Sequence, residues 1–187
     1  MRIALNRAMD CAAFCYLALL ALPTHLHAST AKVFGAWDYA LTSDDSGRPS
    51  RILARVRGEA GSALWISCSR VDDYDGGTVK TVVAAAVTQK AFLGPSRAKG
   101  RSTVTWIDDR PPEIAYWTYR DRSGQLTRDE EVKALVASLA KAEKLTIELS
   151  NYRLETHNVT FALNVSETQA VVEQFTRDCQ SMTNRES

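Results

Sequence analysis

Residues 63–69 (ALWISCS) give the clearest indication of how this chain folds. Leu64, Ile66 and Cys68 alternate with less apolar positions, and this period of two is typical of a β-strand that buries one face. The alternation places the Cys68 side chain on the apolar face of the strand. The segment therefore predicts a sheet with a cysteine in its core.

Short alternating segments of the same kind occur on both sides of residues 63–69, separated by turns rich in Gly, Pro, Asp and Ser. Further strands are expected at residues 37–41, 51–57, 78–88, 103–107, 114–119, 145–149 and 159–165. Because strands come first and helical patterns appear late, the chain is predicted to be an α+β protein. Its sheet is expected to be mainly antiparallel, as an open sheet or a sandwich.

Two helices are expected in the C-terminal half. Thr127 with Glu130 fits a capping box, and an apolar stripe at helical spacing follows it, at Val132, Leu135, Val136, Leu139 and Ala140. Ser166 with Gln169 fits a second capping box. It is predicted to open the final helix, which carries Cys179.

The first 28 residues have the layout of a secretory signal peptide. Arg2 and Arg7 give a positive start, residues 11–23 (CAAFCYLALLALP) form a short apolar core, and small residues follow at Ala28 and Ala31. The apolar run is too short to span a membrane as a helix. We therefore expect residues 1–28 to be a signal peptide and residues 29–187 to be a single exported domain, periplasmic or secreted; cleavage after Ala31 is the alternative.

Removal of the signal peptide leaves two cysteines, Cys68 and Cys179. In an oxidising compartment, two such cysteines are expected to pair. Cys179 follows Val171 and Phe175 at helical spacing, so it should lie on the apolar face of the last helix. The sequence predicts a disulfide between Cys68 and Cys179 that ties this helix to an early strand, with two buried unpaired thiols as the alternative.

The charge of the predicted domain is balanced. The signal peptide takes two of the 23 basic and one of the 22 acidic side chains, which leaves equal numbers of each. A neutral chain lacks the electrostatic footprint of a nucleic-acid-binding protein, so no nucleic-acid partner is expected. No second long apolar run follows, so the exported domain is not expected to span a membrane.

No metal or cofactor is expected. The sequence contains neither a CxxC nor an HExxH motif, and His157 is the only histidine beyond residue 28. Asp72, Asp73 and Asp75 precede two glycines, but Val82 stands where a calcium loop would end in glutamate. A plain turn is the favoured interpretation.

No catalytic residue is assigned. An alternative hypothesis is a secreted hydrolase acting through Asp108 or Asp109 together with His157. Adjacent residues on a strand point to opposite faces, so the two aspartates should not converge on one substrate. His157 lies in a polar connection between two predicted strands, where an exposed structural role is the simpler interpretation.

The predicted hairpin around residues 108–119 is the candidate partner-binding surface, because aromatic and arginine side chains dominate binding hot spots. Its turn is made rigid by two prolines. The candidate residues are Trp106, Asp108, Asp109, Arg110, Trp117 and Tyr119. We expect an exposed aromatic face here that contacts an envelope protein or a cell-wall component.

Several segments resemble periplasmic accessory proteins associated with type VI secretion (the TagO/VasI-like group). The similar features are a strand ending in cysteine, a hairpin followed by tryptophan, and a closing strand with a cysteine-bearing helix. They correspond here to residues 64–68 (LWISC), 104–109 (VTWIDD), Trp117, 161–163 (FAL), Ala170, Phe175 and Cys179, after a start at Trp37 and residues 42–45 (TSDD). In the hairpin, Ile107 stands in the region where that group has an arginine. Invasion-associated locus B-like proteins share much of this one-disulfide layout.

The resemblance implies a non-catalytic, exported accessory or binding protein, associated with a type VI-like secretion system, and it carries over no catalytic residue. A secreted inhibitor or virulence-associated factor on the same scaffold is a further alternative.

Overall fold

The computed structural model describes residues 29–72 and 79–183. The predicted signal peptide and most of the aspartate-rich turn, including Asp73 and Asp75, lie outside the described residues. The described chain forms one antiparallel sheet of ten strands in the order β1-β2-β3-β4-β5-β8-β7-β6-β9-β10. The strands are β1 (Ser29–Phe34), β2 (Trp37–Ser43), β3 (Pro49–Arg57), β4 (Ala63–Asp72), β5 (Val79–Thr88), β6 (Arg101–Ile107), β7 (Glu113–Arg120), β8 (Ser123–Leu126), β9 (Lys144–Ser150) and β10 (Thr156–Ala162).

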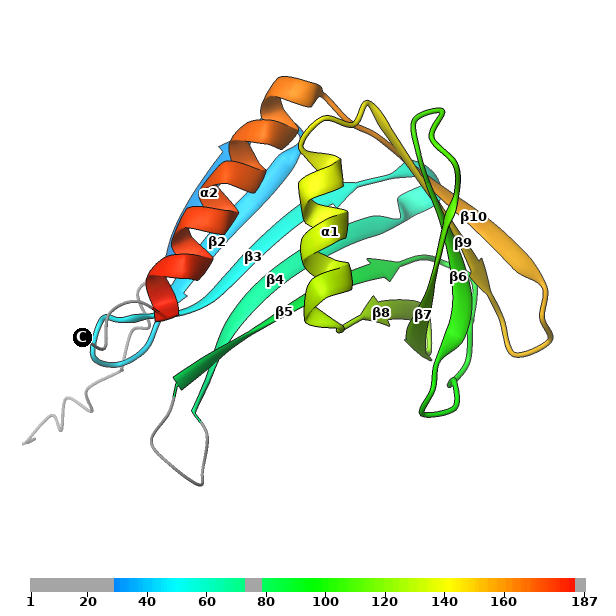
Figure 1. Ribbon diagram of the computed structural model, residues 1–187, viewed down its shortest axis with the longest axis horizontal. Coiled ribbons are helices and arrows are strands. Elements are labelled where there is room, and N and C mark those ends of the chain that lie inside the picture. The colour runs from blue at the N-terminus through cyan, green and yellow to red at the C-terminus, as the bar shows by residue number, and fades with distance from the viewer. Residues whose placement is uncertain (1–28, 73–78, 184–187) are drawn as a thin grey trace, which may run out of the picture.

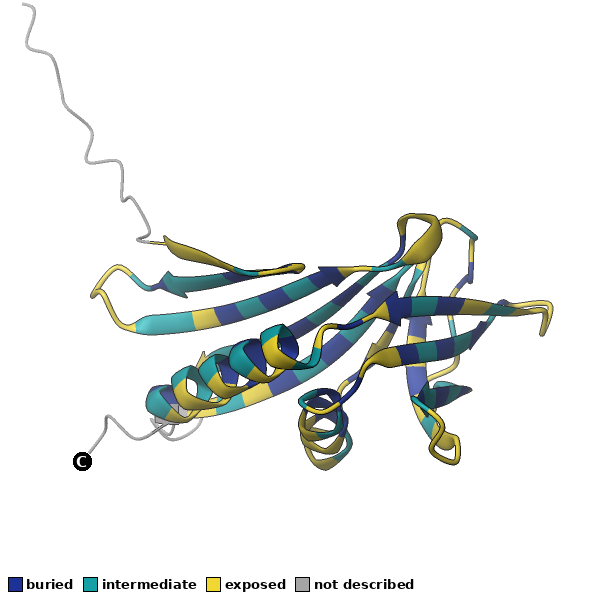
Figure 2. Ribbon diagram, turned by 90° about the horizontal axis from the view of Figure 1, so that it is seen from above, coloured by how far each residue is buried: buried dark blue, intermediate teal, exposed yellow. Residues whose placement is uncertain are grey.

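Two α-helices lie on one face of this curved sheet, as Figures 1 and 2 show: α1 (Asp129–Leu139) and α2 (Val165–Thr183). A single 3-10 turn, η1 (Glu59–Gly61), joins β3 to β4. Helix α2 packs across β1 to β5, whereas α1 contacts β5 and α2. This arrangement confirms the predicted α+β class with a mainly antiparallel sheet and two helices in the C-terminal half.

The core lies between the helices and the face of the sheet that they cover. Alternate residues of β3 and β4 point into it, so Ile52 pairs with Cys68 and Val56 pairs with Leu64, and all four side chains are buried. Intervening residues face the other side, which explains the alternation of buried and less buried positions along each strand (Figure 2). The period-two pattern in the sequence thus predicted the buried face of these strands correctly.

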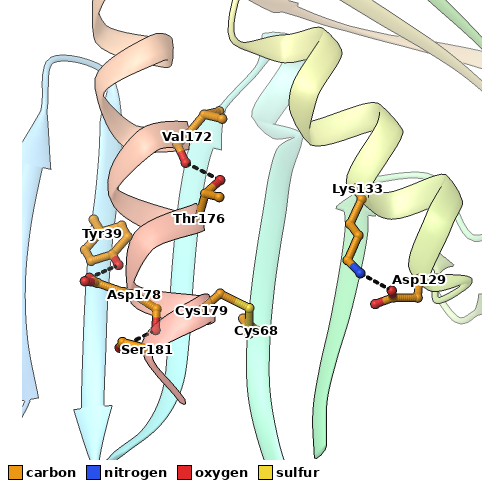
Figure 3. Close-up of a disulfide and its surroundings, with 9 residues drawn as sticks. All are labelled: Tyr39, Cys68, Asp129, Lys133, Val172, Thr176, Asp178, Cys179 and Ser181. Atoms are coloured by element: carbon orange, nitrogen blue, oxygen red, sulfur yellow. Dashed lines mark hydrogen bonds and ion pairs between the residues drawn. A yellow bond between two sulfur atoms is a disulfide. The ribbon is translucent and has the colours of Figure 1, made fainter. Parts of the chain in front are cut away.

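Helix α2 is fastened to the sheet near both of its ends. Near its start, the buried Trp37 indole donates a hydrogen bond from Nε1 to Thr168 Oγ1 (3.1 Å). Near its end, the Tyr39 hydroxyl donates to Asp178 Oδ2 (2.5 Å; Figure 3). Burial, followed by the hydrogen bond to Asp178, raises the pKa of Tyr39 well above its ordinary value.

The predicted disulfide between Cys68 and Cys179 is present and links β4 to α2 (Figure 3). The two Cα atoms lie 5.9 Å apart, and the bond joins residues that are 111 positions apart in the sequence. Cys68 is fully buried. The sequence prediction of a paired cysteine in the core is confirmed.

Both predicted capping boxes are wrong. Helix α1 begins at Asp129, and its N-cap residue Arg128 makes no side-chain capping bond. Helix α2 begins two residues earlier than a cap at Ser166 would place it, because Asn164 Oδ1 accepts hydrogen bonds from the Glu167 amide (3.2 Å) and the Ser166 hydroxyl (2.8 Å). Asn is among the best N-cap residues, since its side chain satisfies amide groups that have no partner within the helix.

Candidate functional site

The hairpin of β6 and β7 does not present the predicted aromatic face. Alternation along β7 separates Tyr116, which is 55% exposed, from Trp117 and Tyr119, which are 1% and 3% exposed and point into the core. The prediction that Trp117 and Tyr119 lie on an exposed binding surface is therefore wrong. Trp106 is half-buried.

The turn of this hairpin is held to the start of β9. Asp108 Oδ1 accepts hydrogen bonds from the backbone amides of Glu143 (2.9 Å) and Lys144 (2.8 Å), so the carboxylate has a structural role. Arg110 donates to the Ile107 carbonyl (3.2 Å). Asp109 and Arg110 are exposed, and their role in partner binding stays a prediction.

The structure does not bring Asp108 and His157 together. The Asp108 carboxylate accepts a hydrogen bond from the backbone amide of Lys144, at the start of β9. His157 lies on β10, opposite Leu149 of β9. Lys144 and Leu149 are five positions apart on β9, which is about 17 Å along an antiparallel strand. A catalytic pair requires hydrogen-bond contact, directly or through one water, so the hydrolase arrangement suggested by the sequence is not formed.

An apolar groove runs between the two helices above β5. Its volume is about 300 Å³, and its lining residues come from β5, α1 and α2. They are Val83, Val132, Lys133, Val136, Ala137, Val172, Phe175, Thr176, Cys179 and Gln180. The disulfide thus forms part of the groove wall through Cys179.

Polar groups at the rim of the groove are engaged within their own helices. The Thr176 hydroxyl donates to the Val172 carbonyl (2.8 Å), and the Lys133 ammonium forms an ion pair with Asp129 (Figure 3). The hydrogen bond to Asp129 raises the pKa of Lys133 above its ordinary value. The groove therefore offers mainly aliphatic and aromatic surface, which suits an apolar group.

Sequence reasoning identified the apolar stripes of both helices but did not predict the groove. Val132, Val136 and Phe175 were expected to be core residues, and they are buried. They also line the groove, because the facing side chains of α1 and α2 leave room between them over β5. The stripes indicate that each helix packs on a sheet, whereas the spacing between the helices depends on the tertiary structure.

Within residues 29–72 and 79–183, no helix is both long and apolar enough to cross a membrane. In the same part of the chain, no three His, Cys, Asp or Glu side chains lie close enough together to hold a metal ion.

Comparisons with known proteins leave the family of this chain open. No protein-family model matches the sequence, and no curated protein matches it. Among solved structures, the chain is similar to invasion associated protein B from Bartonella henselae, with 12% sequence identity and a TM-score of 0.43. The match covers 79% of this chain and 99% of the other, and a likeness this distant assigns neither family nor function.

Proposed function

We propose that this chain is a non-enzymatic, exported binding protein that holds an apolar group of an envelope partner in the groove between α1 and α2. The observation that carries the proposal is the groove itself, which places aliphatic and aromatic side chains of three elements around one opening of about 300 Å³. This volume is at the small end of ligand pockets in proteins. It therefore suits one large apolar side chain or a short acyl segment.

The groove has the construction of a preformed site. Helix α2 is held to β2 by the Trp37–Thr168 and Tyr39–Asp178 hydrogen bonds and to β4 by the disulfide, so one wall is fixed at both ends. A site that is already formed loses little conformational entropy when a ligand enters. Burial of apolar surface then supplies the binding free energy.

The proposal includes two more specific claims, that the chain is exported and that it is associated with a secretion apparatus. The disulfide supports export, because disulfides persist in oxidising compartments and are rare in reducing ones. The link to a type VI-like apparatus rests on the resemblance of the strand, hairpin and cysteine-bearing helix to that group of accessory proteins.

Site-specific crosslinking tests the proposal. A photoreactive amino acid at Ala137, which is exposed and lines the groove, is compared with one at Glu130, which is exposed on the same helix and does not line it. We expect position 137 alone to capture a defined envelope protein from intact cells. Thr176→Trp, which fills the groove from its rim, should abolish the adduct, whereas Glu173→Trp on an outer position of α2 should not.

The outcomes separate the parts of the proposal. Equal capture at both positions, no capture at position 137, or an adduct that survives Thr176→Trp would overturn the groove as the binding site. If the captured protein is a component of a type VI apparatus, the proposed association with that apparatus is supported. If it is another envelope protein, that association is rejected, and the proposal that the groove binds an envelope partner is kept.

A further inference from the structure

Three connections meet at the end of the sheet where the β9–β10 hairpin turns. They are residues 89–100 between β5 and β6, residues 121–122 between β7 and β8, and residues 151–155 between β9 and β10. The first two are joined by hydrogen bonds from the Leu93 and Gly94 amides to the Asp121 carbonyl (2.7 and 3.1 Å). The Arg101 guanidinium joins the first to the strand before the third, because it donates to the carbonyls of Leu93 (3.0 Å) and Ser150 (2.7 Å). The three connections are therefore held together as one surface.

Three large apolar side chains are exposed on this surface: Phe92 (53%), Tyr152 (54%) and Leu154 (78%). The rings of Phe92 and Tyr152 meet edge to face with their centroids 6.2 Å apart, and the Arg153 guanidinium lies 5.3 Å from the centroid of the Tyr152 ring. We call Phe92, Tyr152, Arg153 and Leu154 the hairpin-tip patch. Single exposed apolar residues are common in proteins, whereas a group of them on one surface marks an interaction site.

The backbone of the patch is held in a conformation that leucine disfavours. Leu154 has a φ of +66°, in the left-handed region that bulky side chains rarely adopt. The buried Asn151 builds this turn. Its Oδ1 accepts hydrogen bonds from the backbone amides of Arg153 (2.8 Å) and Glu155 (3.0 Å), and its carbonyl accepts one from the Leu154 amide (3.0 Å). Glycine would adopt this conformation without strain, and strain of this kind concentrates at functional sites, so the exposed leucine indicates a binding role.

The charge at this end of the sheet is mainly positive, although the charge of the whole predicted domain is balanced. Residues 89–100, 120–122 and 151–155 contain six exposed basic side chains and two acidic ones. The basic residues are Lys90, Arg97, Lys99, Arg120, Arg122 and Arg153. Of the two acidic residues, Asp121 forms an ion pair with Arg120 (3.8 Å), and Glu155 Oε2 accepts a hydrogen bond from Asn151 (2.6 Å). The surface that carries the hairpin-tip patch therefore attracts anions.

We infer that the hairpin-tip patch inserts into the surface of a membrane that contains anionic lipids. Such a surface offers apolar burial at the boundary between headgroups and acyl chains, together with attraction for basic side chains, and the patch combines both kinds of group. Figures 1 and 2 show that the β9–β10 hairpin projects at the far right of the molecule. A projecting tip can enter a bilayer surface, whereas small ligands bind in concave sites. The inference goes beyond the proposed function and is independent of it, because no residue of the patch lines the α1–α2 groove.

Co-sedimentation with lipid vesicles tests the inference. All described strands and helices lie between residues 29 and 183, so the test uses the chain from residue 29, which keeps the apolar segment at residues 11–23 away from lipid. Binding to vesicles of phosphatidylglycerol and phosphatidylcholine in equal amounts should be about tenfold stronger, or more, than binding to phosphatidylcholine alone. Added salt should weaken it, because salt screens the basic side chains.

Leu154→Gly is the most informative variant, because it removes the apolar side chain and relieves the backbone strain. Its binding to the mixed vesicles should fall about tenfold or more, while its Tm stays the same or rises. Phe92→Ser should also bind more weakly, and Arg153→Gln should lose about fivefold, the effect of one basic side chain at an anionic surface. The matched controls Val33→Ser and Lys32→Gln replace exposed residues of β1, at the opposite edge of the sheet, and should bind like the parent protein.

Three results would overturn the inference: no binding to the mixed vesicles, equal binding to both kinds of vesicle, or unchanged binding by Leu154→Gly. An equal loss in Val33→Ser would do the same, because it would place the contact elsewhere. Binding of polyglutamate without binding of vesicles would also reject the inference and would assign the patch to an acidic protein. Thr176→Trp, which fills the α1–α2 groove, should leave vesicle binding unchanged, so failure of this inference and failure of the proposed function can be told apart.

Discussion

Replacing both Cys68 and Cys179 by alanine should lower stability without changing the folded structure. The disulfide closes a loop of 111 residues, and the chain-entropy treatment gives about 5 kcal/mol of stabilisation for a loop of that length. For a domain of this size, 1 kcal/mol corresponds to about 2–4 °C in Tm, so we expect a decrease of about 10–20 °C. Alanine is preferred to serine because Cys68 is fully buried, and a hydroxyl group there would need a hydrogen-bond partner.

The assay compares unfolding of the oxidised protein, the reduced protein and the double alanine variant by circular dichroism, in heat and in denaturant. The reduced protein and the variant should unfold together and well before the oxidised protein. Their near-ultraviolet spectra should match that of the oxidised protein below the transition, because the Trp37–Thr168 and Tyr39–Asp178 hydrogen bonds still hold α2 on the sheet. Identical unfolding of the oxidised and the reduced protein would show that the disulfide does not stabilise the domain. Loss of the near-ultraviolet signal in the variant would show that the disulfide maintains the folded structure, which would refute the view that it acts by restricting the unfolded chain.

Three further substitutions test individual contacts. Trp117→Ala should destabilise the fold by about 3–5 kcal/mol, because the side chain is buried in the core; a change below 1 kcal/mol in denaturant unfolding would contradict that placement. Asn164→Ala should cost about 1 kcal/mol through loss of the α2 N-cap, and Asn164→Asp, which keeps the acceptor, should restore it. Because the pKa of Tyr39 is raised in the folded protein, tyrosine ionises first in the unfolded chain. The contribution of Tyr39 to the free energy of unfolding is therefore complete below pH 10 and is lost as the pH rises. The free energy of unfolding of Tyr39→Phe should therefore fall less between pH 9 and 11 than that of the parent protein, and equal slopes would rule this out.

The sheet was predictable where one face of a strand is apolar and the other is not. Residues 63–69 have this pattern, and β4 buries the expected side chains. Strand β1 (Ser29–Phe34) was missed because most of its residues are exposed on both faces, so burial imposes no alternation. Strand β8 (Ser123–Leu126) was missed because it has four residues, one of them Gly124, and too few positions for a period.

The orientation of the hairpin could not be derived from alternation alone. On β7, one set of alternate residues includes Trp117 and Tyr119 and the other includes Ile114 and Tyr116, so both sets contain aromatic and apolar side chains. Which set is buried depends on pairing with β6, and here the more polar residues of β6 face inward. One of them, Thr103, is tolerated in the core because its hydroxyl lies 2.5 Å from that of Tyr119, which satisfies both groups.

The α1–α2 groove could not be predicted from the sequence either, because no local pattern encodes it. A cavity forms where side chains from separate elements fail to fill the space between them, and that depends on the distances between elements rather than on local pattern. In the α1–α2 groove, the position of α2 is set by Thr168, Asp178 and Cys179, which bond to β2 and β4. The sequence predicted the disulfide correctly but not its place in the groove wall. The bond that stabilises the domain therefore also determines how far α2 can stand from α1, and with it the shape of the proposed binding site.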